Sequence, residues 1–536
     1  MKTRNMSWKR KGFILAFLAP TVIAFVLFYF YPIVTVFVTS FCKWDYTNIT
    51  SPEFFGFADM WNNYKYIFEL YPYFWEALRN STIWALLGVF VQIPVSALIA
   101  LAFSRKVKGV KFARNVYIIP SMISSAAMGM IFLQLYSPLY GVVNPVIRLF
   151  KQNFSENILL LKGPAFIAMT CAYIFFTGTT TLMILGNIMA VPEDVREAAM
   201  LDGASGLKQD WYITIPMIKD TLRTVSILSA TAGFLLYNEV YFLTKGAAGT
   251  YSISYVIREL AITSTRTQFG RANAVAVIQI LAGMLIIVFV NLLYSQLFKG
   301  KESEETEVSH EQKNEIQSPG TYNVPGNKDL YLYLSCMGSS GGSAASGLAV
   351  HLQSEKDPLA RPGFQLPDSI CLDGYISTFR DLHVMRYFGN SMIIAGVSVV
   401  ISILMISMSA YVVARMEFKG KKLVNLMLYS TMFIPATALT YPVYNLVNKM
   451  HIYNTRGALI FIYACSGLAV SFFVIKNYYA NIPHELEEAA RIDGCGYAMT
   501  WWKVIFPIAR PGIMTAGVLA FLNNWNEYYW GFSGDR

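Results

Sequence analysis

Residues 191–205 read VPEDVREAAMLDGAS, and residues 482–496 read IPHELEEAARIDGCG. The two stretches align without a gap, and each aligned identity lies 291 residues from its counterpart. Seven of the identical pairs are Pro192 and Pro483, Glu197 and Glu488, Ala198 and Ala489, Ala199 and Ala490, Asp202 and Asp493, Gly203 and Gly494, and, further along, Pro216 and Pro507. Such an internal repeat predicts that the chain contains two copies of one structural unit.

Each repeat has the residue types of a short helix that ends in a tight turn. Acidic residues come first, where the positive end of a helix dipole favours them. Paired alanines leave a shallow surface, and Gly203 or Gly494 permits the turn at the helix end. The pattern predicts an exposed element that docks onto another protein. The plain alternative is that Glu197 and Glu488 only stabilise the start of a helix.

The composition is that of a membrane protein. Hydrophobic residues make up 55% of the 536 residues and charged residues only 14%, and the mean hydropathy is +0.42. A soluble domain carries roughly 25% charged residues. The net charge of +10 does not indicate nucleic-acid binding, because the basic residues lie in short runs between apolar segments. The six cysteines lack the paired spacing of a disulfide scaffold or a zinc site.

Charge-free windows predict the membrane spans, because about 20 apolar residues cross a bilayer core of about 30 Å. Six windows come first, the fifth interrupted only by Glu239: 12–42, 80–104, 115–147, 163–192, 224–244 and 272–298. Four come later, the last interrupted by Glu527: 387–414, 423–448, 457–475 and 511–534. Residues 330–354 form a further weak candidate, because their centre is rich in Gly and Ser. We therefore expect eleven membrane segments at most.

These windows predict two transmembrane domains, 1–300 and 328–536, joined by a polar linker at 301–327. The first span of the second domain is expected to be degenerate and its last span missing. Lys and Arg residues gather at the N-terminus and in the loops after the second and fourth spans. This bias places both repeats on the cytoplasmic side of the cell membrane.

The repeated motif, Glu-Ala-Ala-x-x-Asp-Gly, resembles the EAA coupling loop of bacterial ABC importer permeases. The residues of the motif are similar to those in the carbohydrate-uptake branch of this family, whose members take up maltose, glycerol-phosphate and oligosaccharides. The resemblance covers about residues 8–299 and 351–533. It implies an all-α integral membrane protein with two tandem type-1 importer transmembrane domains, of six spans plus about four or five. The family's two permease subunits are usually separate chains, so this chain resembles two of them joined, with the second incomplete.

The resemblance also implies the function and the partners. The chain is expected to be the permease of an ATP-driven carbohydrate importer, with no catalytic residues, metal or cofactor of its own. Its implied partners are cytoplasmic ATP-binding subunits, an external sugar-binding protein and the carbohydrate, and no nucleic acid. The sequence holds no G-x-x-x-x-G-K-[ST] motif, so a separate ATPase must supply the energy. The implied ATPase-coupling residues are Glu197, Ala198, Ala199, Asp202, Gly203, Pro216, Glu488, Ala489, Ala490, Asp493, Gly494 and Pro507.

An Asn-Glu pair follows each repeat within an apolar window. An acidic residue inside a membrane span costs roughly 2.5–3.5 kcal/mol on insertion scales, and it tends to face a cavity or a partner. Neighbouring aromatic rings and amides suit the rings and hydroxyls of a sugar. The predicted pathway residues are Tyr237, Asn238, Glu239, Trp525, Asn526 and Glu527. The plain alternative is that these acids pair or snorkel near the outer interface.

Two other interpretations stay open. A secondary transporter would also show repeated spans and intramembrane acids, although the repeat here is parallel. A fused or frameshifted permease pair that no longer transports would also fit, because residues 330–354 offer little apolar surface for insertion. Co-purification with an ATPase and uptake by the expressed chain distinguish these interpretations.

Overall fold

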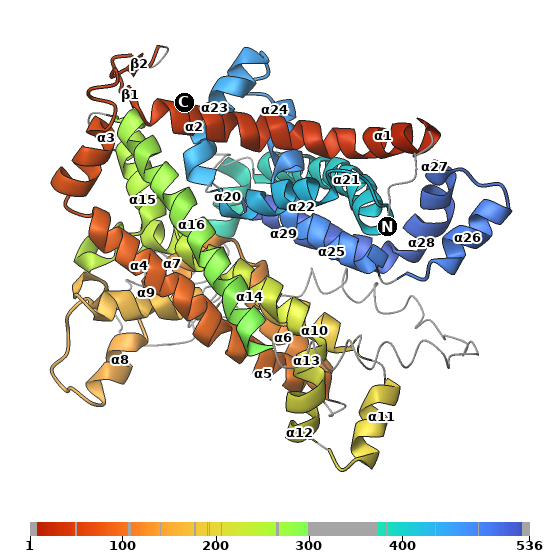
Figure 1. Ribbon diagram of the computed structural model, residues 1–536. Coiled ribbons are helices and arrows are strands. Elements are labelled where there is room, and N and C mark those ends of the chain that lie inside the picture. Colours follow the sequence, from red (N-terminus) through yellow and green to blue (C-terminus); the bar gives the residue numbers. More distant parts are fainter. Residues whose placement is uncertain are drawn as a thin grey trace. The chain divides into compact units, whose positions relative to one another are not determined.

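The computed structural model of this chain is all-α apart from one two-stranded sheet (Figure 1). Its strands, β1 (Cys42–Lys43) and β2 (Glu53–Phe54), pair antiparallel. The structure describes residues 8–48, 51–105, 109–139, 141–175, 178–189, 191, 193–204, 206–263, 267–298, 373–381, 384–434, 436–480 and 482–527. The expected linker and the weak candidate span at 330–354 lie outside these ranges.

The described residues fall into two compact units. The first unit draws on Met1–Trp75, Ile253–Leu281 and Thr378–Arg536, and the second unit draws on Glu76–Ser252 and Ala282–Ser377. These units do not follow the order of the two predicted domains along the sequence. The domain boundaries at 300 and 328 therefore stay predictions.

Five helices are long and apolar enough to cross a bilayer: Trp8–Thr39, Phe74–Ser104, Pro164–Met189, Phe269–Leu297 and Val384–Arg415. Three bent helix pairs raise the number to at most eight: Val110–Ser121 with Ser125–Leu135 (95°), Arg456–Cys465 with Leu468–Ala480 (50°), and Tyr497–Ile508 with Arg510–Trp525 (78°). The all-α membrane fold is confirmed. The described residues nevertheless hold fewer candidate spans than the ten or eleven that the charge-free windows predict.

A stretch without charge need not be one straight helix, and three of the windows are interrupted within the described residues. The window 115–147 breaks at Ser124, whose hydroxyl accepts a hydrogen bond from the Ala127 N–H at 3.3 Å and caps a new helix. The window 224–244 breaks where α14 (Lys219–Phe234) ends, before Glu239 is reached. The window 423–448 divides into α22 (Lys421–Ser430), η10 (Thr431–Phe433) and α23 (Ala436–Lys449).

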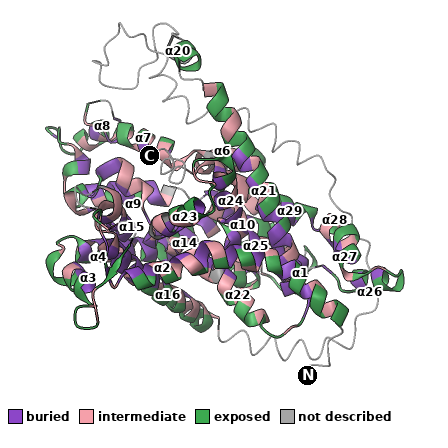
Figure 2. Ribbon diagram, turned by 90° about the horizontal axis from the view of Figure 1, so that it is seen from above, coloured by how far each residue is buried: buried purple, intermediate pink, exposed green. Residues whose placement is uncertain are grey.

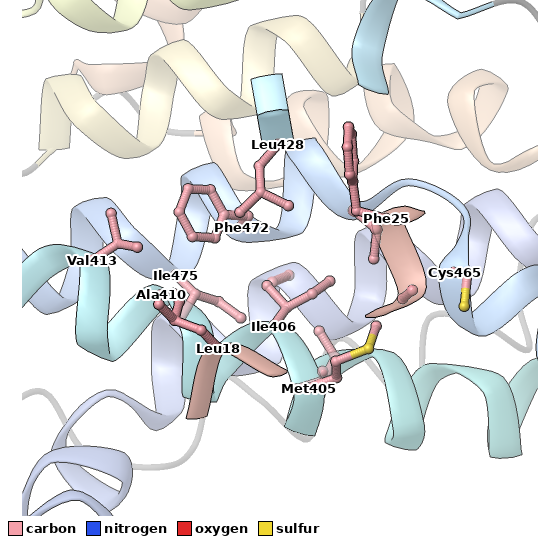
Figure 3. Close-up of a cluster of buried hydrophobic side chains, with 14 of the residues drawn as sticks. Leu18, Phe25, Met405, Ile406, Ala410, Val413, Leu428, Cys465, Phe472 and Ile475 are labelled. Atoms are coloured by element: carbon pink, nitrogen blue, oxygen red, sulfur yellow. The ribbon is translucent and has the colours of Figure 1, made fainter. Parts of the chain in front are cut away.

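In the first unit, the helix at the start of the chain packs against helices near its end. It runs as α1 (Trp8–Phe25), η1 (Val26–Phe30) and α2 (Tyr31–Thr39). Figure 3 shows Leu18 and Phe25 in one apolar cluster with residues of the later helices, such as Met405 and Phe472. The Thr21 hydroxyl donates to the Met405 carbonyl at 2.9 Å. This contact satisfies a polar group inside an apolar interface, where an unpaired one would be costly.

Besides α22, η10, α23 and the short helices of residues 485–508, the first unit holds α3 (Asn62–Lys65), η2 (Tyr66–Leu70), α15 (Ile253–Arg258), η8 (Glu259–Thr263), the start of α16 (Phe269–Leu297), α21 (Val384–Arg415), α24 (Arg456–Cys465), α25 (Leu468–Ala480) and α29 (Arg510–Trp525). Of these, α21, α24, α25 and α29 contribute residues to the apolar cluster. A further short helix, α20 (Asp373–Asp381), precedes α21.

The second unit has its own core, built on α5, α10 and α14. Besides the short helices of residues 193–217, its helices, with the rest of α16, are α4 (Phe74–Leu87), η3 (Gly88–Gln92), α5 (Ile93–Ser104), α6 (Val110–Met122), α7 (Ser125–Leu135), α8 (Val143–Arg148), η4 (Ile158–Leu160), α9 (Pro164–Phe175), α10 (Gly178–Met189), α14, η6 (Val240–Thr244) and η7 (Ala247–Gly249). Ile93, Ile184 and Val225 are buried in one apolar cluster. Beside it, the Tyr173 hydroxyl donates to the Ser229 carbonyl at 2.8 Å, and Ser229 also contacts Gln92.

The candidate spans carry large apolar side chains on their outside. Leu98, Leu285 and Val400 are 64%, 70% and 60% exposed, respectively, and exposed ribbon continues along α16 and α21 in Figure 2. Lipid tails are as apolar as leucine, so such faces are stable in a bilayer. The exposed apolar faces therefore agree with a membrane-embedded protein.

A close helix crossing in the second unit gives a prediction for stability. A Cβ atom added at Gly233 of α14 would lie 2.5 Å from the Trp84 carbonyl oxygen of α4. We expect Gly233→Ala to lower the free energy of unfolding by about 1–3 kcal/mol, because the backbones must separate. Gly186→Ala is the matched control, since a Cβ there meets nothing within 4 Å. Thermal unfolding in detergent measures both variants, and equal midpoints would contradict this packing.

Candidate functional site

The two repeats fold alike. We call residues 191–218 the first loop and residues 482–509 the second loop. The first contains α11 (Glu193–Leu201), and the second contains α26 (Glu485–Ile492). The two helices end exactly 291 residues apart, so the repeat in sequence is also a repeat in structure.

The turn after each helix is the same. Gly203 has φ +80° and Gly494 has φ +81°. The Ala204 N–H donates to the Ala199 carbonyl at 2.9 Å, and the Cys495 N–H donates to the Ala490 carbonyl at 2.9 Å. These bonds form the helix-ending turn in which glycine is preferred, because it adopts positive φ without strain.

Each helix exposes the predicted residues in the same way. Glu197, Ala198 and Asp202 are exposed in the first loop, as are Glu488, Ala489 and Asp493 in the second. The second alanine of each motif, Ala199 or Ala490, is buried. The glutamate and the first alanine of each motif thus face outward, and the second alanine packs the helix against its own unit.

After the turn, the chain follows the same path in both halves. The first loop continues through α12 (Leu207–Gln209), η5 (Asp210–Thr214) and α13 (Ile215–Met217) into α14. The second continues through α27 (Tyr497–Thr500), η11 (Trp501–Ile505) and α28 (Phe506–Ile508) into α29. From η5 and η11 to the ends of α14 and α29, each helix boundary recurs at a spacing of 291 residues.

The prolines of the motif lie at the end of a helix, just before a bend. Pro216 and Pro507 lie in α13 and α28, which continue η5 and η11 with helical backbone angles. The chain bends at Ile218 (φ −99°, ψ 16°) and Ala509 (φ −80°, ψ 2°). The helix Tyr497–Ile508 thus ends one residue after Pro507 and meets Arg510–Trp525 at 78°.

Sequence reasoning missed two exposed apolar residues and one ion pair. Leu201 and Ile492, which match at the same spacing, are 89% and 87% exposed at the ends of α11 and α26. The sequence carries a signal for them, because both repeats have a large aliphatic residue at this equivalent position. The missed ion pair joins Arg415 to Glu487, and the two lie too far apart in sequence for any local pattern to indicate it.

The predicted pathway residues lie in different units, and each set is described by itself. In the second unit, Tyr237 and Asn238 precede Glu239, and all three are half-buried after the break that follows α14. The Tyr237 ring stacks on Tyr241 with ring centroids 5.7 Å apart. Aromatic and acidic groups are thus brought together at this break.

In the first unit, Trp525 ends α29 and Glu527 follows it. The Trp525 ring stacks on Phe521 with ring centroids 5.7 Å apart. The Glu527 carboxylate accepts a hydrogen bond from the Tyr463 hydroxyl at 2.7 Å, and Asn526 Oδ1 is buried without a hydrogen-bond partner among the described residues. The two Asn-Glu pairs lie 288 residues apart, so they are not equivalent in the 291-residue register.

The chain is similar to known membrane-transport proteins. The family model described as binding-protein-dependent transport system inner membrane component matches residues 92–302 and 384–531. The chain is 33% identical over 168 residues to the trehalose transport system permease protein of Mycobacterium tuberculosis. This match covers 31% of this chain and 61% of that protein. It is 35% identical over 176 residues to an arabinooligosaccharides transport system permease protein of Halalkalibacterium halodurans, covering 32% and 62%.

Two further similarities complete the comparison. A diacetylchitobiose uptake system permease protein of Streptomyces coelicolor is 31% identical over 165 residues, covering 31% of this chain and 55% of that protein. The match spans less than two thirds of the length of each of these three curated relatives. A solved bacterial ABC transporter that imports the polysaccharide alginate aligns over 54% of this chain and 96% of the transporter chain, with 20% identity and a TM-score of 0.46.

Proposed function

The chain belongs to the family of binding-protein-dependent transport system inner membrane components, and we propose that it forms the membrane pathway of an ATP-driven carbohydrate importer. The observation that carries the proposal is the pair of loops that share one backbone geometry at a spacing of 291 residues. Family membership confirms the prediction of a multi-pass inner-membrane transport component. It also argues against the secondary-transporter alternative.

The exposed face of each loop supports docking onto a cytoplasmic ATPase subunit. Leu201 and Ile492 present large apolar side chains almost entirely to solvent, beside the exposed Glu197 and Glu488. Leu207 and Trp211 of the first loop and Trp502 of the second are also more than half exposed, and an apolar patch rimmed by polar residues is typical of a protein interaction site. Two equivalent loops suit two copies of one ATPase subunit, so energy transfer would involve both halves of the chain.

Three features support two tandem transmembrane domains. The family model matches in two segments, the helix boundaries after the loops recur in one register, and both loops carry the same motif. The second segment, 384–531, begins where α21 begins. We therefore infer that each segment supplies one half of the translocation pathway.

The substrate class follows from the relatives and from the predicted pathway residues. Relatives are described as transporting trehalose, arabinooligosaccharides or diacetylchitobiose. The rings of Tyr237 and Trp525 offer faces for sugar rings, and the Asn526 amide offers hydrogen bonds for hydroxyls. A carbohydrate delivered by an external binding protein is therefore the proposed substrate.

The test is to purify the tagged full chain from the cells that make it. We expect a protein with a Walker A motif to co-purify, identified by mass spectrometry, and we expect ATP-dependent uptake of a labelled oligosaccharide from a panel. A chain that reaches the membrane with no associated ATPase would refute the proposal. That result would favour the alternative of a fused permease pair that no longer transports.

The pathway residues give a second prediction. Trp525→Ala is expected to raise the KM for sugar uptake by roughly fivefold, because one aromatic stacking contact contributes about 1 kcal/mol. The amount of co-purified ATPase should stay the same. Trp8→Ala, which removes an indole that is 87% exposed at the start of α1, is the matched control. An unchanged KM for Trp525→Ala would remove this residue from the pathway.

A further inference from the structure

The second loop is tied to a membrane helix by a buried ion pair. Arg415 Nε donates to the Glu487 carboxylate at 2.8 Å, and the two side chains are only 1% and 4% exposed. Arg415 is the last residue of α21, and Glu487 lies in the first turn of α26. The pair therefore connects the end of a candidate span directly to the helix that carries Glu488 and Ala489.

Arg415 also holds the chain that leads into α26. Its Nη1 donates to the Ile482 carbonyl at 2.7 Å, and its Nη2 donates to the Pro483 carbonyl at 3.2 Å. Nη1 also donates to the Tyr479 carbonyl at 3.5 Å, so one guanidinium binds three backbone carbonyls and one carboxylate at once. The planar fork of arginine makes this possible, whereas the single ammonium of lysine cannot reach all four groups.

The first loop is anchored in a different way. The position equivalent to Glu487 carries Arg196, of opposite charge, whose Nη2 donates to the Ile188 carbonyl at 2.7 Å. The ion pair of that loop joins Arg105 to Asp210 at 3.0 Å, and the Arg105 side chain is 48% exposed. Exposed pairs contribute little. Breaking the buried pair would leave Glu487 with the half-exposed Arg491, 3.7 Å away, as its ionic partner among the described residues, and such a pair compensates a buried charge poorly.

The start of α1 also packs against the second loop. The Phe13 ring lies 5.4 Å from the Tyr497 ring, and the Phe17 ring lies 5.1 Å from the Trp501 ring, between centroids. Figure 1 shows the start of α1 beside α27. Arg10 and Arg415 line one cavity of about 190 Å³ together with Glu487. The start of α1 and the end of α21 therefore lie on the same side of the unit as the loop.

We propose that Arg415 is a positioning residue that fixes α26 to the end of α21, so that a movement of the docked ATPase passes into that membrane helix. The coupling consequence rests on the proposed function, but the position of α26 can be measured without it.

The first experiment is hydrogen exchange on the purified full chain. Arg415→Met and Glu487→Ala should each raise the exchange rate of the α26 amides by about tenfold or more, while the α29 amides stay unchanged. Glu488→Ala is the matched control on the same helix, and Arg105→Met is the control for losing an arginine in the first loop. Both should leave α26 exchange at the wild-type rate. Unchanged α26 exchange in Arg415→Met would overturn the proposal.

The second experiment measures the ATPase retained by the same variants. We expect Arg415→Met to retain at least about tenfold less ATPase than wild type, and Arg415→Lys to fall between them, because lysine keeps the charge but makes fewer bonds. If Arg415→Met does not accumulate, Arg415→Lys and Glu487→Gln are compared instead, and wild-type exchange in both would overturn the proposal. A wild-type chain that retains no ATPase refutes the proposed function, and the exchange result then decides the positioning role alone.

Discussion

Replacing Leu201 and Ile492 together with aspartate is expected to detach the ATPase from the purified chain. Both side chains are almost fully exposed, so the substitutions remove no internal contact. Burying each side chain under a partner contributes about 2 kcal/mol, and loss of about 4 kcal/mol corresponds to roughly a thousandfold weaker binding. Quantifying the ATPase that co-purifies with the tagged chain measures the effect.

The control for this variant is an equally exposed apolar residue outside the loops. Leu149 follows α8 and is 79% exposed. Leu149→Asp should retain the ATPase at the wild-type level. If the double variant at Leu201 and Ile492 also retained it within about twofold, roughly 0.4 kcal/mol, the exposed ends of α11 and α26 would not be docking sites.

Valine at both Gly203 and Gly494 is expected to abolish uptake while the chain stays in the membrane. Both glycines have φ near +80°, and a Cβ at either position meets nothing within 4 Å. The cost is therefore conformational, about 1–2 kcal/mol at each turn and more for a β-branched residue. The turn then leaves its native geometry, which uncouples ATP hydrolysis from transport. Uptake and ATP hydrolysis measured together in proteoliposomes provide the test.

Asparagine at the same positions provides the control, because it tolerates positive φ better than other non-glycine residues. We expect Gly203→Asn with Gly494→Asn to keep most of the uptake. Equal loss in the asparagine and valine variants would show that the absence of a side chain, rather than the backbone conformation, is what these positions require.

The sequence predicted the local features of the loops because those features depend on local chemistry. The acidic residues, the alanines and the glycine of each motif determine a helix and its final turn within a few residues. The charge-free windows predicted the membrane class correctly, but they missed the breaks at Ser124 and after Phe234. Those breaks depend on capping and on helix geometry, which composition does not measure.

Contacts between distant segments lay beyond the sequence reasoning. An apolar window gives the length of a helix but not its neighbour, so nothing in residues 12–42 indicated packing against α21. The pairing of Arg415 with Glu487 spans 72 residues, and neither residue stands out in its own segment. Exposure of Leu201 required the three-dimensional path of the turn, because the residue reads as part of an ordinary amphipathic helix.

The packing of α1 on the later helices has a consequence for synthesis on the ribosome. Thr21 and its partner Met405 are separated by 384 residues. At about 5–20 residues per second, Met405 is translated about 20–80 s after Thr21. During that time the first helix must wait in the bilayer with its buried face turned to lipid or to an insertion factor. The first helix is thus made first but completes its packing only after α21 has been made.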